Sequence, residues 1–208
     1  MHFCFILLPF SMRITSLNLN GIRAAQRKGL NEWIAEHQAD VYCFQEIKID
    51  EAALQKEVEV PAGYHSVAFP AQKKGYSGSM IWSKQEPTHY STGIGDQMMD
   101  GEGRVQVADI GAYRIINAYF PSGTTGDIRQ SEKERFLALY EKWLPQQTAS
   151  GKTLVLAGDF NICHKPLDIH DPVRNKNVSG FLPHEREWMT QLLSQGYVDT
   201  LREVTQEP

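Results

Sequence analysis

Apolar and polar positions alternate along the chain in patterns that separate strands from helices. Residues 41–45 form a short and almost fully apolar run, which is typical of a strand buried on both faces. Residues 13–19 alternate more loosely and end at an Asn-Gly turn signal. Over residues 29–38 apolar side chains instead recur every three or four positions, which predicts a helix with one packed face.

The same reading continues to the end of the chain. Runs rich in aromatic and aliphatic residues predict strands over 64–69, 78–83, 105–110, 113–120 and 153–157. Amphipathic spacing predicts helices over 50–58, 130–146 and 182–195. The tight Gly111-Ala112 connection joins two of the strands as a hairpin. Helix–strand units at both ends of a strand-rich centre favour an α/β sandwich, with helices outside two packed sheets.

Length and the start of the chain bear on domain organisation. A chain of 208 residues is the size of one domain with a single core. We assign residues 12–208 to that domain and set residues 1–11 apart as an extension of doubtful structure, since a convincing first strand begins after Met12. The apolar start is too short to span a bilayer and lacks a signal peptide's basic region and cleavage site, so no membrane association is expected.

Net charge and cysteine content bear on nucleic-acid binding and on cellular location, but they do not indicate a function. The net charge is −4, so the overall charge gives no indication of nucleic-acid binding. A mildly acidic protein can still bind DNA through a local basic face. The three cysteines are unpaired in spacing and form no zinc pattern. A reducing cytoplasm is therefore the expected location.

Polar residues gather where predicted strands end, and this clustering is the main functional clue. They are Asn20, Glu46, Tyr119, Asp159 and Asn161. In open α/β architectures ligands bind at the carboxyl ends of strands. Each residue alone is unremarkable, so the candidate site rests on their shared position.

Gly158-Asp159-Phe160-Asn161 follows an apolar strand, and alternation predicts Asp159 and Asn161 side by side on one face. A carboxylate beside a neutral amide suits a hard cation such as Mg²⁺. A plain turn is the alternative, because these residue types are common turn formers. Glu46 is a stronger candidate for a functional residue, since a carboxylate directly after a buried strand must be solvated, paired or metal-bound. A salt bridge to Lys48 is its simplest alternative explanation.

Basic residues recur in the loops that hold these candidates, as a phosphate-backbone footprint requires. A solvated face is the alternative reading. They are Arg23, Arg27, Lys28, Lys73, Lys74, Arg104, Arg129, Arg174 and Lys176.

Several ordered segments resemble the exonuclease III family of apurinic/apyrimidinic endonucleases, within the endonuclease/exonuclease/phosphatase superfamily. The matching segments are Leu17-Asn18-Leu19-Asn20-Gly21-Ile22-Arg23, Phe44-Gln45-Glu46-Ile47-Lys48, Gly75-Tyr76-Ser77-Gly78, Gly101-Glu102-Gly103-Arg104-Val105, Asn117-Ala118-Tyr119-Phe120-Pro121, Gly158-Asp159-Phe160-Asn161-Ile162, Gly180-Phe181-Leu182-Pro183 and Glu185-Arg186-Glu187-Trp188. The match runs in order from Met12 to the end of the chain.

The resemblance implies a four-layered α/β sandwich that is truncated at its carboxy terminus. It also implies a Mg²⁺ site, which Mn²⁺ could also fill. Glu46 looks like the principal metal ligand, with Asn20 in its immediate shell. Asp159 resembles the carboxylate that positions the attacking water, and Asn161 the amide that stabilises the pentacovalent phosphate. Both are also placed near the metal. Tyr119 resembles a tyrosine that contacts the phosphate.

The implied partner is double-stranded DNA with abasic sites or 3′ ends. The implied activities are incision 5′ to abasic sites and 3′-to-5′ exonuclease action or 3′-end trimming. Arg104 and Asn175 fall in segments that touch DNA in relatives, and we add Arg23 and Lys48 as DNA-contacting candidates. A monomer is favoured, although the sequence does not determine the oligomeric state.

The family pattern continues past Pro208 into a Ser-Asp-His motif that supplies a histidine–aspartate pair. None of His164, His170 and His184 is expected to replace it, and His170-Asp171 is expected to be solvated. Weak or absent activity is therefore anticipated, with a histidine base commonly contributing about 10²- to 10⁴-fold. The alternatives are an inert DNA-binding remnant and a phosphoesterase of the same superfamily with another substrate.

Overall fold

A computed structural model describes residues 5–7 and 12–207, which form two compact units. The first unit contains residues 12–119 and 142–159 together with the short strand at 5–7. The second contains residues 120–141 and 160–207. Each unit is described by itself below.

The first unit holds two mixed β-sheets. The five-stranded sheet has the order β1-β2-β3-β5-β4, and the four-stranded sheet has the order β6-β7-β8-β9. The strands of the larger sheet are β1 (Phe5–Leu7), β2 (Arg13–Asn18), β3 (Val41–Gln45), β4 (His65–Phe69) and β5 (Ser79–Ser83). Those of the smaller sheet are β6 (His89–Thr92), β7 (Val105–Ile110), β8 (Tyr113–Tyr119) and β9 (Thr153–Asp159).

Each sheet contains one parallel pair of strands. In the larger sheet β2 runs parallel to β3, and the other pairs are antiparallel. In the smaller sheet β8 runs parallel to β9, while β6, β7 and β8 pair antiparallel. The β7–β8 pair closes at Ile110 and Tyr113, which confirms the predicted hairpin at Gly111-Ala112. Because parallel strands end on the same edge, each sheet presents two carboxyl ends together.

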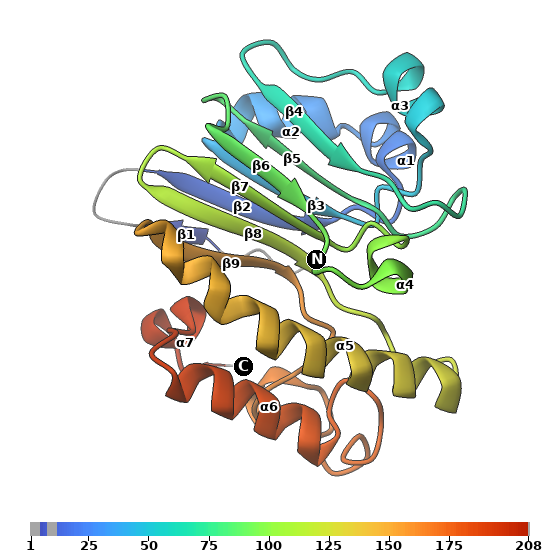
Figure 1. Ribbon diagram of the computed structural model, residues 1–208, viewed down its shortest axis with the longest axis vertical. Coiled ribbons are helices and arrows are strands. Elements are labelled where there is room, and N and C mark those ends of the chain that lie inside the picture. Colours follow the sequence, from blue (N-terminus) through green and yellow to red (C-terminus); the bar gives the residue numbers. More distant parts are fainter. Residues whose placement is uncertain (1–4, 8–11, 208) are drawn as a thin grey trace. The chain divides into compact units, whose positions relative to one another are not determined.

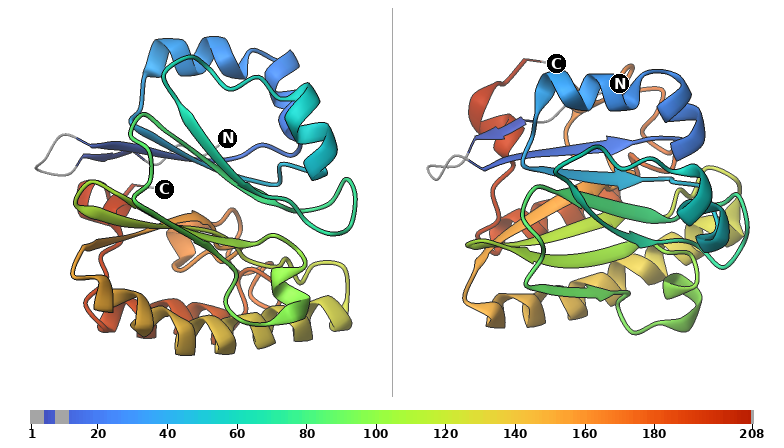
Figure 2. Two further views of the ribbon diagram at one scale, coloured as in Figure 1. Left: turned by 45° about the horizontal axis from the view of Figure 1, so that its top comes forward. Right: turned by 90° about the horizontal axis from the view of Figure 1, so that it is seen from above.

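The two sheets pack face to face around an apolar core, as the left view of Figure 2 shows. The larger sheet contributes Val41, Cys43 and Ile81 to this core, and the smaller one contributes Ile115 and Val155. Every residue of β3 is buried, which confirms the reading of 41–45 as a strand covered on both faces.

Helices cover the outer face of the larger sheet. They are α1 (Ile22–Arg27), α2 (Leu30–His37) and α3 (Glu51–Glu57). A second apolar cluster joins Ile34 of α2 to Tyr42 and Phe44 of β3 and Trp82 of β5. A single-turn helix, α4 (Gln97–Asp100), precedes β7.

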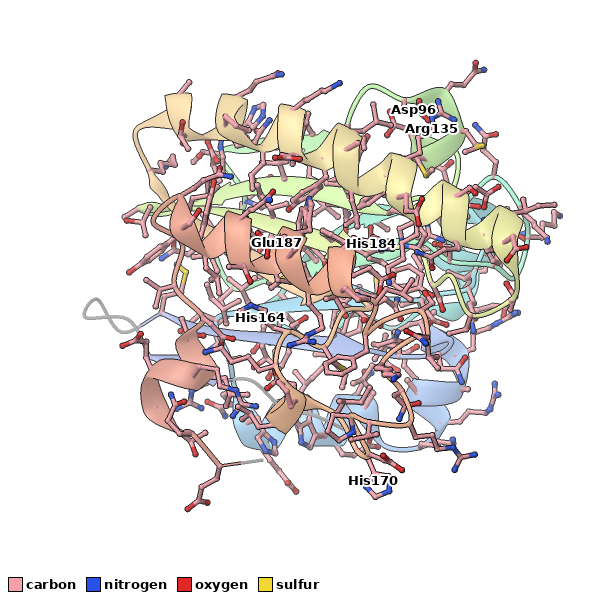
Figure 3. The ribbon with its side chains drawn as sticks, turned by 90° about the horizontal axis from the view of Figure 1, so that it is seen from below. Asp96, Arg135, His164, His170, His184 and Glu187 are labelled. Atoms are coloured by element: carbon pink, nitrogen blue, oxygen red, sulfur yellow. The ribbon has the colours of Figure 1, made fainter. Side chains whose placement is uncertain are left out.

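The second unit is mainly helical. Its main helices are α5 (Asp127–Gln147, whose end from Lys142 belongs to the first unit), α6 (Pro183–Ser194) and α7 (Thr200–Val204). There are two short 3₁₀ turns. One, Thr148–Ser150, follows α5 and belongs to the first unit, and the other, Pro166–Asp168, belongs to the second unit. Figures 1 and 3 show α5 and α6 side by side. Rings of Phe136, Tyr140, Phe160 and Trp188 gather around Phe120, with centroid separations of 4.6–5.6 Å.

Most predicted elements match the observed ones within a few residues. The short helices and strands that were not predicted are β1, α1, β6, α4 and α7, and neither 3₁₀ turn was predicted. Within the segment set apart as an extension, residues 5–7 pair with β2, and the rest of that segment lies outside the described residues. Among the helices of the described ranges, none combines the length and apolarity needed to cross a membrane.

Candidate functional site

Four polar side chains of the first unit lie at the strand ends. Asn18 ends β2 opposite Gln45 of β3, and Glu46 is the next residue after Gln45. In the other sheet Tyr119 ends β8 directly opposite Asp159, the last residue of β9. Both parallel pairs therefore bring one carboxylate and one hydrogen-bonding side chain to their carboxyl ends.

The Asn18 side-chain amide joins the two carboxylates. Its Nδ2 donates to Glu46 Oε1 at 2.8 Å and to Asp159 Oδ2 at 2.9 Å. The Tyr119 hydroxyl donates to the same Glu46 Oε1 at 2.9 Å. We call these four residues the strand-end cluster. It links side chains of both sheets, and its residues are half-buried and reachable from solvent.

The charge of Glu46 is balanced locally. Lys48 Nζ lies 2.6 Å from Glu46 Oε2, so the salt bridge considered from the sequence is present. Burial alone would raise the pKa of Glu46, but hydrogen bonds from Lys48, Asn18 and Tyr119 outweigh burial and lower it. Burial and the adjacent Glu46 carboxylate raise the pKa of Tyr119, which keeps its phenol protonated as a donor.

Left-handed backbone conformations surround the cluster. Asn20, Glu46, Lys48 and Ser77 have φ values of 49°, 53°, 49° and 40°. Main-chain hydrogen bonds hold these loops together, including those from Gly21 N to Glu46 O at 2.7 Å and from Lys48 N to Ser77 O at 3.0 Å. Non-glycine residues in this region cost on the order of 1–3 kcal/mol each, and such strain concentrates at functional sites.

Gly158 allows Asp159 to lie opposite Tyr119. Its φ is 138°, and a Cβ at this position would lie 1.9 Å from Ala118 O on β8. Any other residue would force β8 and β9 apart at the point where they end. The glycine of the sequence motif is thus explained by close approach of two backbones.

A buried polar network lies beneath the cluster and was not predicted. Gln45 Nε2 donates to Asn117 Oδ1 at 2.7 Å, and Asn117 Nδ2 donates to Gln106 Oε1 at 3.2 Å. All three side chains are at most 1% exposed. The network connects β3 with β7 and β8 and fixes the two sheets relative to each other directly below Glu46 and Tyr119. A run of amides inside otherwise apolar strands was its only sequence signal.

Arg104 is almost fully buried, with a side chain that is 2% exposed. Its predicted contact with DNA stays a prediction. Its guanidinium donates to Glu102 Oε2 at 2.6 Å and to Tyr119 O at 2.9 Å, and lies 4.6 Å from the Tyr119 ring centroid. Arg104 therefore supports Tyr119 from within the protein.

Asn18, and not Asn20, is the asparagine that contacts the two carboxylates. Asn20 is exposed, and its Oδ1 accepts a hydrogen bond from Lys48 Nζ. This partner is a lysine rather than a carboxylate, so the metal role of Asn20 stays a prediction. Asn18, which the sequence analysis missed, contacts both carboxylates. Its signal was a polar residue at an alternating position at the end of a strand.

Asn161 belongs to the second unit, whereas Asp159 belongs to the first. Their predicted side-by-side arrangement therefore stays a prediction. Asn161 Nδ2 donates to Phe120 O at 2.9 Å, and its own carbonyl accepts from Lys133 Nζ at 2.7 Å. The Phe160 ring packs against the Phe120 ring, with the centroids 4.6 Å apart and the planes tilted by 37°.

The remaining DNA-contacting candidates have protein partners. Arg23 Nη1 lies 3.1 Å from Glu57 Oε2 on an exposed surface. Lys48 pairs with Glu46 as described, and Asn175 Nδ2 donates to His170 O at 2.8 Å. Exposed contacts of this kind exchange easily with ligands, so these DNA roles remain predictions.

Histidines of the second unit form no catalytic group with one another. Figure 3 shows His164, His170 and His184 apart from one another, with His184 on α6. His170 is exposed, as expected. The His184 ring lies 3.2 Å from Glu134, and the His164 ring bonds to the Thr190 hydroxyl at 3.0 Å. Burial lowers the pKa of His164 below its ordinary value.

The strand-end cluster fits a hard cation. Within the described ranges no three side chains drawn from His, Cys, Asp and Glu gather closely enough to hold a metal. Mg²⁺ does not need such a group, because it is held by one or two carboxylates and keeps several waters. Glu46 and Asp159 supply two carboxylates that share one amide donor.

Comparison with known proteins agrees with this geometry. The model of the endonuclease/exonuclease/phosphatase family matches residues 15–204, across both units. The DNA repair nuclease APEX1 of Danio rerio is 36% identical over 198 residues, covering 93% of this chain and 63% of the zebrafish protein. The exodeoxyribonuclease of Bacillus subtilis is also 36% identical over 198 residues, covering 93% of this chain and 75% of that protein.

A solved AP endonuclease from Archaeoglobus fulgidus has the same fold. Its TM-score is 0.81 with 29% identity, over 92% of this chain and 74% of the archaeal one. This likeness confirms the predicted sandwich of two mixed sheets flanked by helices, and the similarities confirm the resemblance to exonuclease III. The chain belongs to the endonuclease/exonuclease/phosphatase family.

Proposed function

We propose that this protein is a magnesium-dependent DNA-repair nuclease that hydrolyses phosphodiester bonds in duplex DNA. The observation that carries the proposal is the strand-end cluster, in which the Asn18 amide joins Glu46 and Asp159 while Tyr119 bonds to Glu46. Two carboxylates, an amide and a protonated phenol are suited to holding a hard cation beside a phosphate. We propose incision 5′ to abasic sites and trimming of 3′ ends as its activities.

Glu46 and Asp159 are the residues that would hold the metal, with Asn18 orienting both carboxylates. The chemistry that bound Mg²⁺ or Mn²⁺ supplies is polarisation of the phosphoryl oxygen and stabilisation of developing charge. Glu46 suits this role, because its lowered pKa keeps the carboxylate ionised at neutral pH.

The protein's own groups would complete the hydrolysis. Asp159 would accept a proton from the attacking water, whose oxygen bonds to phosphorus while the bond to the 3′ oxygen breaks. Tyr119 and Asn161 would donate hydrogen bonds to the phosphoryl oxygens as negative charge grows on them. The 3′ oxygen leaves as a hydroxyl after gaining a proton from solvent, and Asp159 returns its proton to solvent, so one water is consumed for each bond cleaved.

The relatives named above support the choice of substrate. One is called a DNA repair nuclease, one an exodeoxyribonuclease and one an AP endonuclease. We accordingly propose double-stranded DNA with abasic sites or 3′ ends as the partner, bound by a monomer. Cys43 is a buried free thiol, and a cytoplasmic location is part of the proposal.

One observation favours a second candidate, an inert DNA-binding protein. Lys48, Asn18 and Tyr119 already satisfy the Glu46 carboxylate without any metal ion. A protein that had lost metal-dependent cleavage could keep this arrangement. It would bind duplex DNA in a salt-dependent manner and leave the strands intact with Mg²⁺.

An incision assay on labelled duplexes separates the candidates. One duplex carries an abasic site and a second a recessed 3′ end, each with Mg²⁺ or with chelator. Glu46→Ala and Asp159→Asn should each slow cleavage by at least about a hundredfold, since metal-ion charge stabilisation is worth several kcal/mol. Glu36→Ala, at an exposed position on α2, is the matched control and should cleave normally.

Cleavage that survives both substitutions, or proceeds in chelator, would contradict the proposal. Binding of the duplex without cleavage would favour the inert candidate. The same assay on a version extended by the family's Ser-Asp-His segment tests whether that segment raises the rate by the factor expected of a histidine base, about 10²- to 10⁴-fold.

A further inference from the structure

The second unit contains a buried ion pair that the proposed chemistry does not use. Lys133 of α5 and Glu185 of α6 are both 0% exposed, and their charged atoms lie 2.7 Å apart. A buried pair of this kind adds little stability over well-packed apolar residues, because both charges must leave water. Stability alone therefore gives no reason for charges at these positions.

Glu185 binds the loop that leads into α6. Its Oε2 accepts from Gly180 N at 2.7 Å and from Leu182 N at 3.1 Å. Its Oε1 accepts from Gln130 Nε2 at 3.2 Å in addition to Lys133. The Gly180 carbonyl in turn accepts from Cys163 N at 2.7 Å, so this loop is bonded to the segment that carries Asn161.

Lys133 reaches Asn161 directly. Its ammonium donates to Asn161 O at 2.7 Å while it remains paired with Glu185. Asn161 has a φ of 51°, a conformation that needs support from its surroundings. With its side-chain amide bonded to Phe120 O, Asn161 is fixed at both its backbone and its side chain.

An apolar pair could fill the same space but could not hold a carbonyl. A lysine ammonium has three donors, so it can bond to a carboxylate and a carbonyl at once. Glu185 in turn holds that ammonium in position. The Glu185 carboxylate is itself fixed by four other donors of the same unit, the backbone amides of Gly180 and Leu182 and the side chains of Gln130 and Ser179. The orientation of Asn161 thus depends on a buried cation that is itself held in place.

We propose that Lys133 and Glu185 are positioning residues that hold Asn161 in the geometry needed to donate to the phosphate. This inference rests on the proposed function, because Asn161 is the catalytic group through which the pair would act. Neither residue would touch the substrate, and replacing both should slow the reaction without a matching change in substrate affinity.

The test is a double-mutant cycle between the pair and Asn161. The paired variant Lys133→Met with Glu185→Gln removes both charges together, and the amide oxygen introduced by Glu185→Gln can still accept from the Gly180 and Leu182 amides. In the protein with Asn161 intact, kcat should fall by about 10- to 100-fold, with KM changed less than about threefold, since misplacement by about 1 Å costs on that order. In an Asn161→Ala background the same pair of substitutions should change kcat by less than about threefold.

A second measurement needs no catalytic activity. The side-chain NH₂ of Asn161, assigned by its disappearance in Asn161→Ala, is followed by ¹⁵N NMR and hydrogen exchange. The paired variant should expose this NH₂ to faster exchange by at least about tenfold, because the bond to Phe120 O would be held less firmly. Replacing another ion pair of this unit, with Arg202→Met and Asp168→Asn, should leave both the NH₂ signal and kcat unchanged.

Additive losses in the cycle, or an Asn161 NH₂ that exchanges normally in the folded paired variant, would overturn the inference. If Asn161→Ala leaves cleavage unaffected, the proposed role of Asn161 fails and the exchange measurement alone decides whether the pair positions it. Equal losses from the Arg202 control would show a general effect of weakening the unit and would also overturn the inference.

Discussion

Two lysine–glutamate pairs of this protein differ in their access to water. In the first unit Lys48 and Glu46 lie 2.6 Å apart with side chains 32% and 18% exposed. In the second unit Lys133 and Glu185 lie 2.7 Å apart and neither is exposed. The two pairs therefore have nearly equal separations between their charged atoms, but one is reachable by water and the other is fully buried.

The difference shows which pair can exchange its partner. A solvent-reachable ammonium can leave a carboxylate at little cost, so Glu46 can accept a cation or release Lys48 to a phosphate. A fully buried ammonium has no such alternative, because separation would strand two charges without water. The first pair is therefore suited to binding a ligand and the second to holding backbone in place.

The largest expected effect is on stability. Lys133→Met should lower the free energy of unfolding by about 3–5 kcal/mol, because it leaves Glu185 charged and buried without a cation. Lys48→Met should lower it by less than about 1 kcal/mol. Urea denaturation of both variants measures the difference, and equal losses would contradict the comparison.

Arg104 offers an intermediate case, since it is 2% exposed while its partner Glu102 is 21% exposed. Arg104→Met should cost about 1.5–3 kcal/mol, the range for hydrogen bonds to charged groups. Turnover should fall as well, because Tyr119 loses the bond at its carbonyl. Denaturation and the incision assay together check this, and a variant with normal stability and turnover would remove Arg104 from the account.

Substitutions of Asn18 and Asn20 test the role of the solvent-reachable Lys48–Glu46 pair. Asn18→Ala should slow cleavage by about 10- to 100-fold, because hydrogen bonds to charged groups are worth about 1.5–3 kcal/mol. Asn20→Ala should slow it by less than about threefold, since the side chain bonds to the exchangeable Lys48 ammonium. Initial rates at saturating Mg²⁺ measure both. A larger loss at Asn20 would return the metal role to the residue first predicted.

The smallest expected effect is in the pH dependence of stability. The pKa of Glu46 is lowered in the folded protein, so Glu46 stabilises the fold above the ordinary carboxyl pKa of about 4.3 and loses this contribution as the pH falls through its folded pKa. Glu46→Gln should therefore make the acid side of the stability profile less steep. Thermal unfolding followed from neutral pH into the acid range detects this, and identical profiles would contradict it.

The sequence revealed the long elements because their patterns are strong. β3 is apolar except for Gln45, and α6 combines a proline at its start with a helical stripe. β6 was missed because His89-Tyr90-Ser91-Thr92 is polar, and only its pairing with β7 at the edge of the sheet makes it a strand. Short α4 and α7 have too few turns to show a period.

The site was predicted in part for the same reason. Glu46, Tyr119 and Asp159 follow obvious strands, so their common edge could be inferred. Asn18 was passed over because a sequence does not show which amide lies between two carboxylates. Lys133 did carry a signal, because it stands at helical spacing before Phe136, Leu137 and Tyr140, on a stripe that the fold buries. A charge on such a stripe needs a buried partner, which only tertiary structure identifies.

The most direct test of the central claim is metal binding by the strand-end cluster itself. Mn²⁺ titration followed by electron paramagnetic resonance counts bound ions without requiring turnover. One ion per chain is predicted, displaced by Mg²⁺, lost in Glu46→Gln, weakened in Asp159→Asn and retained in Glu36→Gln. Unchanged binding in both the Glu46 and Asp159 variants would contradict the assignment of a metal site to this cluster.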